Sequence, residues 1–297
     1  MTATILTENP LPGLPSASGV EILGDVASVI GDDSPFLYQL DAATLALTVR
    51  IALFDAGAAF ATGRLPKHTK PDLECMAALT WPDGRPGLLL LGSGSQPNRA
   101  RGWFVPHENP VPEPVDLAPL YALLVPLLPA GVVLNLEAAA TTATELLLFQ
   151  RTVGRADAAL LFVLPLAEAL RFLVGPVGAA APAVHQLVFE LPLLGGYPAG
   201  FSGATFVDGL LFVSASVENT ADAVLDGDVL GSYVGVVDVA ASQATLALLA
   251  WPDGRPYFGK VEGLAVRQQL APGQFELLLV TDDDAGGSTA ATARLVL

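Results

Sequence analysis

The sequence repeats one pattern five times: a short apolar segment, then a second apolar segment that ends in small, polar or acidic residues. In four copies a glutamate stands near the start of the first segment, at Glu21, Glu74, Glu137 and Glu262. The remaining copy has Ser202, Gly203 and Ala204 at this point. Self-similarity at a period of roughly 60 residues is typical of a repeat architecture, and it constrains the fold before any local assignment does.

Each copy contains enough strand-forming segments for one unit of a β-propeller. In the first copy, apolar runs at 19–23, 26–30, 36–40 and 45–54 are separated by Gly, Asp and Ser residues typical of turns. Four consecutive antiparallel strands per repeat form a propeller blade. We therefore predict an all-β fold in which residues 1–297 form a single β-propeller domain with five blades, six blades being the alternative. Residues 116–127 and 164–173 have helix-forming composition and predict short helical insertions.

Composition excludes several classes of partner. The formal net charge is -16, which disfavours a nucleic-acid partner. No apolar run reaches the roughly 18 to 20 residues of a membrane helix, so we expect no membrane partner. The N-terminus shows no secretory signal, so we expect a cytoplasmic location. Cys75 is the only cysteine, which excludes an intrachain disulfide.

Strand direction brings the repeated polar residues to one face. Two antiparallel strands joined by a tight hairpin place the start of the first beside the end of the second. Radial repetition should gather these ends around one mouth of the central channel. The expected set consists of the four glutamates and of residues at the ends of the second strands, namely Asp32, Asp33, Ser93, Ser95, Gln150, Arg151, Ser214, Glu218 and residues 282–284.

Two interpretations of the glutamates stay open. Four carboxylates around a narrow channel must be protonated, spread apart, paired with cations or bound to a metal. Oxygen ligands without cysteine favour Ca²⁺, with Mg²⁺ second, and Glu21, Glu74, Glu137 and Glu262 are the candidate metal ligands. Alternatively, each glutamate accepts hydrogen bonds from a neighbouring blade and serves the structure alone.

The fourth copy lacks the glutamate, and its second segment offers Ser214, Glu218 and Asn219 instead. Glu218 is the residue that could complete the ring. An asymmetric blade is where a symmetric scaffold can place its specificity. The acidic residues that follow, Asp222, Asp226 and Asp228, fit a solvated loop equally well.

Cationic residues suggest an anion site beside the ring. Ser93 and Ser95 lie in a glycine-containing turn followed by Arg99 and Arg101, and Arg151 and Arg155 follow the corresponding strand of the third copy. Such a loop can hold an anion, with an arginine adding a bidentate contact, although a tight turn is the simpler interpretation. Lys70 and Lys260 lie close enough in sequence to Glu74 and Glu262 to pair with them.

An exact hexapeptide, Trp-Pro-Asp-Gly-Arg-Pro, occurs at residues 81–86 and again at 251–256. The two copies stand at different places within the repeat. Pro-Asp-Gly favours a turn, so we predict two turns with an aromatic anchor, and a ligand-binding motif is the alternative.

Several segments resemble an uncharacterised bacterial β-propeller family. They are residues 21–33, 134–137 with Gln150 and Arg151, 200–204, 218–235 and 260–263, and residues 226–232 are the most distinctive. More distantly, the glutamate-led strand is similar to esterase-like phytase and calcium-dependent lactonase or phosphotriesterase propellers. That resemblance implies a divalent ion at the channel mouth, held by Glu, Asp and Asn side chains. Here only Asn135 and Asn219 match the asparagines, and Ala138 stands where the closer family often has glycine.

Together these observations predict a Ca²⁺-dependent hydrolase of an ester, lactone or phosphoester. In this hypothesis the glutamates hold the ion, and Asp282, Asp283 or His68 moves the proton. Asp32, Ser93, Ser95, Arg99, Gln150, Arg151, Ser214, Glu218 and Asn219 would contact a small-molecule substrate or ligand. The alternative is a non-catalytic propeller that binds a small ligand or a protein partner across its rim.

Overall fold

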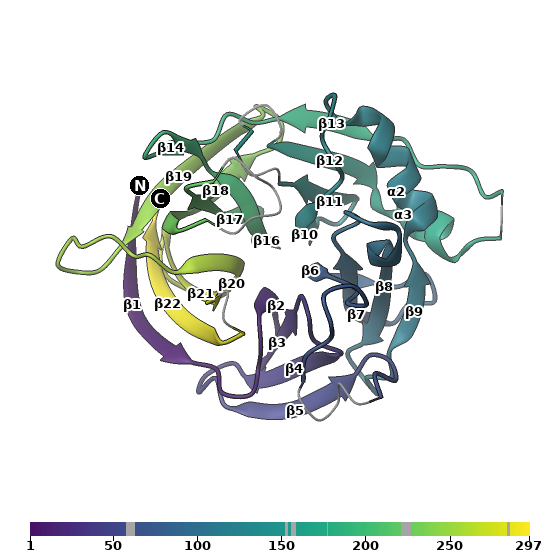
Figure 1. Ribbon diagram of the computed structural model, residues 1–297, viewed down its shortest axis with the longest axis horizontal. Helices are drawn as coiled ribbons and strands as arrows, with labels where there is room; N and C mark the ends of the chain where they lie inside the picture. Colours follow the sequence, from purple (N-terminus) through teal and green to yellow (C-terminus); the bar gives the residue numbers. More distant parts are fainter. Residues whose placement is uncertain (58–62, 152–153, 156–158, 177, 221–226, 284–285) are drawn as a thin grey trace.

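The computed structural model describes residues 1–57, 63–151, 154–155, 159–176, 178–220, 227–283 and 286–297. Within them the protein is mostly β-structure. Three of its sheets are four-stranded and antiparallel, consistent with propeller blades, and a further large sheet is mixed. These sheets surround a common centre, and strands β2, β6, β10, β16 and β20 lie closest to it (Figure 1).

The three four-stranded sheets follow the chain in order. The first contains β2 (Ala17–Leu23), β3 (Val26–Gly31), β4 (Phe36–Asp41) and β5 (Leu47–Ala52). The second contains β6 (Leu73–Thr80), β7 (Pro86–Gly92), β8 (Arg101–Pro106) and β9 (Glu113–Asp116). The third contains β10 (Leu136–Thr141), β11 (Glu145–Gln150), β12 (Leu160–Pro165) and β13 (His185–Val188). The four strands predicted for the first copy are confirmed, with small shifts at their ends.

The large sheet has eight strands. In spatial order they are β16 (Gly200–Val207), β17 (Leu210–Glu218), β18 (Val229–Asp238), β19 (Gln243–Ala250), β1 (Thr2–Pro10), β22 (Ser288–Val296), β21 (Gln274–Asp282) and β20 (Lys260–Ala271). Its parallel contact, between β1 and β19, covers Ala3 opposite Leu249 and Thr4 opposite Ala250. This contact divides the sheet into two antiparallel sets of four. The N-terminal strand β1 completes the last set by pairing with the C-terminal strand β22.

Short helices and a small hairpin complete the described structure. They are α2 (Ala118–Leu124), the 3₁₀ turns η1 (Pro97–Arg99) and η2 (Val125–Leu127), α3 (Leu166–Val174), β14 (Leu193–Leu194) and β15 (Tyr197–Pro198). The predicted helical insertions at 116–127 and 164–173 are therefore confirmed. In the described part of the chain, no helix has the length and apolar character needed to cross a bilayer.

Apolar clusters between neighbouring sets of strands hold the assembly together. Phe149 of β11 packs edge-on against Phe201 of β16, with ring centroids 4.9 Å apart. Phe212 of β17 packs against Phe275 of β21 in the same way, at 4.8 Å. All four rings are buried. Burying a phenylalanine contributes about 1.5 to 3 kcal/mol, so these contacts fix each set of strands against the next.

The innermost strands share a β-bulge at equivalent positions. The pairing register of each with its neighbour shifts at the residue that stands at this position, namely Ser18, Glu74, Glu137, Ser202 and Glu262, and the β20 pairing shifts twice more farther along. A bulge leaves one residue outside the ladder and re-aims its side chain. Ser18, and not Glu21, is thus the counterpart of the other three glutamates. The prediction that Glu21 belongs to the same ring is therefore not supported by the register.

The residue after each bulge is small, because the innermost strands approach one another there. These residues are Gly19, Cys75, Ala138, Gly203 and Gly263. A Cβ atom on Gly263 would lie 2.9 Å from the Cα of Gly19, and one on Gly203 would lie 2.9 Å from the Cα of Gly263. Backbone contacts this close leave no room for a side chain. The channel is consequently narrow just below the bulge residues.

Candidate functional site

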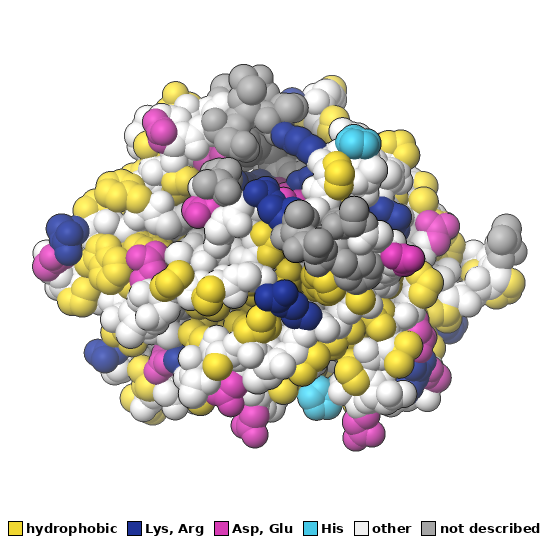
Figure 2. All heavy atoms as spheres, turned by 60° about the horizontal axis from the view of Figure 1, so that its bottom comes forward, with side chains coloured by type: hydrophobic (Ala, Val, Ile, Leu, Met, Phe, Trp, Pro, Cys, Tyr) yellow, Lys and Arg dark blue, Asp and Glu magenta, His cyan; other side chains and the backbone are white. Residues whose placement is uncertain are grey.

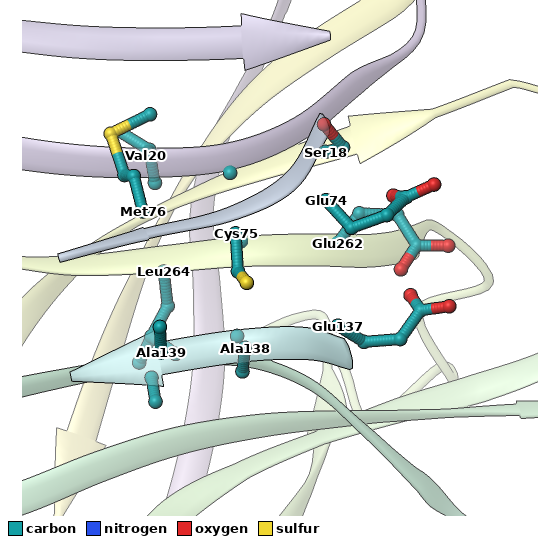
Figure 3. Close-up of a pocket in the computed structure, with 14 residues that line it drawn as sticks. Ser18, Val20, Glu74, Cys75, Met76, Glu137, Ala138, Ala139, Glu262 and Leu264 are labelled. Atoms are coloured by element: carbon teal, nitrogen blue, oxygen red, sulfur yellow. The ribbon is translucent and has the colours of Figure 1, made fainter. Parts of the chain in front are cut away.

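A small cavity extends from the channel mouth into this narrow level. Ser18, Glu74, Glu137 and Glu262 line it, together with the small residues that follow the bulges. The carboxylates of Glu74, Glu137 and Glu262 point toward one another at one end of the cavity (Figure 3). Measured as space for the centre of a water-sized sphere, the cavity volume is about 10 Å³. This is roughly the room that one water molecule needs.

On one side of the mouth, a buried arginine binds three carboxylates. Arg151, just after β11, places Nη1 3.3 Å from Oε2 of Glu137 and 3.2 Å from Oε2 of Glu262, and its Nη2 pairs with Glu218. Lys260 adds an ion pair to Glu262 at 3.2 Å. We call Glu137, Arg151, Glu218, Lys260 and Glu262 the arginine cluster. Because its members come from three different sets of strands, it also ties these sets together.

On the other side, a buried lysine binds two aspartates. Lys70 Nζ lies 2.7 Å from Oδ1 of Asp72 and also pairs with Asp32. Arg99 Nη1 donates to Oδ2 of Asp72 at 2.7 Å, and Ser93 Oγ donates to the same oxygen at 2.5 Å. We call Asp32, Lys70, Asp72 and Arg99 the lysine cluster. Burial lowers the pKa of Lys70, but the Asp32, Glu74 and Asp72 carboxylates outweigh it and raise that pKa, so Lys70 is charged.

Asp72 has an unusual backbone. Its φ is 56°, in the left-handed region that residues other than glycine seldom adopt. Its carbonyl accepts the N–H of Ser93 at 2.9 Å, and its carboxylate is held by the contacts above. A strained conformation of this kind persists only where the surroundings over-determine it. The contacts of the lysine cluster supply that restraint.

Glu74 lies between the two clusters without a partner. None of the described residues makes a hydrogen bond or an ion pair with its carboxylate. Burial, followed by the charges of Asp72, Glu137 and Asp32, raises the pKa of Glu74 well above its ordinary value. One oxygen each from Asp32, Asp72 and Glu74 lie within 4.8 Å of one another. Three carboxylates this close form an oxygen-only set of the kind that Ca²⁺ and Mg²⁺ accept.

Two further carboxyl groups have raised pKa values. Burial raises the pKa of Glu262 to about 7, although Arg151 and Lys260 act in the opposite direction. Burial raises the pKa of Glu21 to about 8, opposed by a hydrogen bond of 3.3 Å from Thr205 Oγ1. Glu21 and Thr205 each stand three residues after the bulge of their strand, beyond the narrow level of the channel. Glu21 is therefore separated from the mouth.

Most of the predicted site residues do meet at the mouth. Glu74, Glu137 and Glu262 face one another, and Glu218 reaches Arg151 where the fourth copy lacks a glutamate. Asp32, Ser93 and Arg99 belong to the lysine cluster or contact it, and Ser95 Oγ accepts from Arg99 at 2.8 Å. Figure 2 shows Lys, Arg, Asp and Glu side chains gathered around a hollow in the upper part of that view.

Other predicted residues serve the surrounding structure. Gln150 Oε1 accepts the N–H of Asn135 at 2.7 Å, and Ser214 Oγ lies 3.2 Å from Ser202 Oγ. Asn219 bonds Asp228 across its loop, with 2.8 Å from the Asp228 N–H to Oδ1. Asp33 pairs with Arg64 at 2.6 Å.

The proposed proton carriers lie at the edge of the site. His68 is exposed in the turn before Lys70 and makes no hydrogen bond or ion pair with the described residues. Asp282 is opposite Lys260 in the strand pairing, and Asp283 Oδ1 accepts the Gly287 N–H at 2.7 Å. Asp222, Asp226 and Asp284 lie outside the described residues.

The arginines of the predicted anion site contact other groups of the protein. Arg99 contacts Asp72, and Arg151 contacts three glutamates. Arg101 packs over Phe54 and Trp103, and Arg155 donates to the carbonyl of Ala130 at 3.1 Å.

Sequence reasoning missed Asp72, which binds both cations of its cluster. A signal for it exists: a polar residue stands two positions before each bulge glutamate, namely Asp72, Asn135 and Lys260. Asn135 Nδ2 donates to Oε1 of Glu137 at 2.6 Å, and Lys260 pairs with Glu262. Asn135 and Lys260 thus support their glutamates, whereas Asp72 contacts Lys70 and Arg99 and repels Glu74.

Fold and site define a predominantly β protein with propeller-like sheets and a charged channel mouth. A family model described as a family of unknown function (DUF6929) matches residues 13–295, and the chain belongs to this family. A search of curated proteins found no match.

Two solved structures show the same type of fold. Glutaminyl cyclase from Myxococcus xanthus is 12% identical with a TM-score of 0.52, and the match covers 100% of this chain and 97% of that one. A tail fiber of a Staphylococcus aureus phage, P68, is 10% identical with a TM-score of 0.50, covering 100% of this chain and 53% of that one. At such identities the likeness concerns the fold alone.

Proposed function

We propose that the chain is a five-bladed β-propeller whose channel mouth binds a divalent cation, Ca²⁺ first and Mg²⁺ second, and that it hydrolyses an ester, lactone or phosphoester there. One observation carries this proposal: the carboxylates of the mouth outnumber its cations by two, and Glu74 is the one with which none of the described residues makes a hydrogen bond or an ion pair. The described carboxylates are Asp32, Asp72, Glu74, Glu137, Glu218 and Glu262, and the described cations are Lys70, Arg99, Arg151 and Lys260.

Buried charges must be paired, protonated or bound to a metal. Two protons or one divalent ion would balance the excess of carboxylates. The donor set fits a hard cation because it consists of oxygens alone, and Glu74 with Asp32 and Asp72 would hold the ion. Lys70 already contacts both aspartates, so it would share their oxygens with the ion. When bound, such an ion would polarise a substrate oxygen or activate water.

Among the described residues, Glu262 is the best placed to move a proton. It lines the same cavity as Glu74, and its pKa of about 7 allows it to accept and release a proton near neutral pH. Arg151 and Lys260 fix the position of its carboxylate. Asp282, Asp283 and His68, which the sequence suggested for this role, lie farther from the cavity lining.

A thermal shift experiment tests the metal. Chelator-treated protein should gain thermal stability when Ca²⁺ is added, and less when Mg²⁺ is added, because an ion that binds only the folded state stabilises it. The loaded protein should then hydrolyse at least one class in a panel of esters, lactones and phosphoesters. Unchanged melting with either ion would remove the basis of the proposal.

A non-catalytic role is the second candidate, and the ion pairs favour it. Arg151 and Lys70 already neutralise most of the carboxylates, and the cavity has room for about one water molecule. In this alternative two of the carboxyl groups hold protons, the clusters join the blades, and a small ligand binds across the rim. Protein that binds no divalent ion and turns over no substrate, yet keeps its stability, would support it.

A further inference from the structure

The two copies of the Trp-Pro-Asp-Gly-Arg-Pro hexapeptide form the same turn. In both, the tryptophan N–H donates to the arginine carbonyl at 2.8 Å, in Trp81 and Arg85 as in Trp251 and Arg255. In both, the aspartate Oδ1 accepts the arginine N–H at 3.1 Å, and Oδ2 accepts from the arginine Nε. The sequence prediction of two turns is confirmed. Any difference between the copies therefore comes from their surroundings.

The first copy is covered by its own chain. Glu113, at the start of strand β9, accepts from both terminal nitrogens of Arg85, at 2.5 and 3.1 Å. The ring of Phe104 stacks on Trp81 with centroids 4.4 Å apart, and the Arg85 guanidinium lies over the same ring. Trp81 is buried as a result. The carboxylate of Glu113, a residue of an extended strand, thus binds the Arg85 guanidinium.

The second copy is open. It lies in the link between β19 and β20, which projects from the rim at the left of Figure 1. The Arg255 side chain is 74% exposed, against 42% for Arg85. None of the described residues accepts a hydrogen bond from the two terminal nitrogens of Arg255. None of the described residues takes the place at Arg255 that Glu113 takes at Arg85.

A groove adjoins the open arginine. Its volume is about 430 Å³, and it is lined by Glu8, Trp251, Arg255, Pro256, Tyr257, Phe258 and Gly259. Phe258 is 63% exposed and gives the groove an apolar surface. The Tyr257 hydroxyl donates to Glu8 at 2.6 Å, so the groove's own carboxylate is engaged. Gly259 lets the Tyr257 ring pack against the backbone, since a Cβ there would lie 2.4 Å from that ring.

We propose that this groove binds an extended acidic peptide segment of a partner protein, whose carboxylate takes the place at Arg255 that Glu113 takes at Arg85. The planar guanidinium offers a two-pronged contact that suits a carboxylate. Trp251 and Phe258 provide apolar area for the neighbouring residues of the peptide. The first copy shows that the hexapeptide turn accepts this kind of occupant.

A peptide from the first copy provides the probe. A labelled peptide of residues 110–115, capped at both ends so that Glu113 is its one charge, is titrated with the full chain and followed by fluorescence anisotropy. We expect saturable binding with a dissociation constant below about 1 mM. The same peptide with Glu113→Gln should bind at least about tenfold more weakly, because it loses a charge-assisted contact.

Protein variants locate the binding. Arg255→Ala should weaken binding at least about tenfold, and Arg255→Lys should weaken it in part, because lysine keeps the charge and loses the fork. Arg171→Ala removes another exposed arginine, from helix α3, and should change nothing. Folding is not at risk in the Arg255 variants, because that side chain is largely exposed. Absence of saturable binding, or equal binding by the Arg255→Ala protein or the Glu113→Gln peptide, would overturn the proposal.

Discussion

Both sides of the channel mouth contain cations that pair with carboxylates, but the two sides differ in how many carboxylates the central cation binds. In the arginine cluster, Arg151 reaches Glu137, Glu218 and Glu262 at once. Beside the lysine cluster, where Lys70 reaches two aspartates, none of the described residues makes a hydrogen bond or an ion pair with Glu74. A guanidinium presents five N–H donors in a plane, whereas an ammonium group is a compact charge with three. The number and arrangement of donors on each cation thus decide how many carboxylates it pairs with.

Removing the arginine should have the largest effect on stability. Arg151→Met leaves Glu137 and the buried Glu218 and Glu262 short of a partner, and we expect it to lower the free energy of unfolding by about 3 to 5 kcal/mol in urea denaturation. Arg151→Lys keeps the charge and should recover part of the loss. A change below about 1 kcal/mol for Arg151→Met would mean that the cluster does not join the strand sets as described.

The buried carboxyl group of Glu21, which lies outside both clusters, should make stability depend on pH. Its pKa of about 8, against an ordinary 4.5, means that the folded protein holds this proton more tightly than the unfolded chain. The resulting stabilisation is complete below the unfolded value and is lost as the pH rises through about 8. Between about pH 5 and 8 the wild type should lose about 3 to 4 kcal/mol more stability than Glu21→Gln. Parallel pH profiles for the two proteins would contradict the burial of this group.

The lysine cluster should depend on its cation less strongly. Lys70→Met leaves Asp72 with Arg99 and Ser93, so we expect a loss of about 2 kcal/mol, smaller than for Arg151→Met. Added Ca²⁺ should restore more stability to Lys70→Met than to the wild type, because an ion can replace the missing charge beside Glu74. The Arg151→Met protein serves as the control and should gain no extra stability. Equal calcium effects in both variants would show that the two halves do not differ in this way.

The strand pattern could be predicted from the sequence, because each strand of the first copy is bounded by local turn residues. The convergence of Glu74, Glu137 and Glu262 followed from strand direction alone. The exact set of residues at the mouth could not be predicted. The bulge that places Ser18, and not Glu21, at the mouth depends on the pairing register. A shift in register changes which side chains face the channel, and no residue in 17–21 signals it.

Contacts between distant segments also could not be predicted from the sequence. Arg151 was interpreted as part of an anion site, and its ligands Glu218 and Glu262 are brought to it by two other sets of strands. Strand β1 was not foreseen as the outer strand of the last set, because its partners, β22 and β19, lie at the far end of the chain. Lys70 lies near Glu74, as its place in the sequence predicts, but it pairs with Asp32 and Asp72.

We propose that Glu74, with which none of the described residues makes a hydrogen bond or an ion pair, binds a divalent ion. Calorimetric titration of Ca²⁺ into chelator-treated protein tests it most directly, with wild type, Glu74→Gln and Glu21→Gln compared side by side. We expect one ion per chain for the wild type and for Glu21→Gln, and no measurable binding for Glu74→Gln. Absence of calcium binding by the wild type, or undiminished binding by Glu74→Gln, would contradict it.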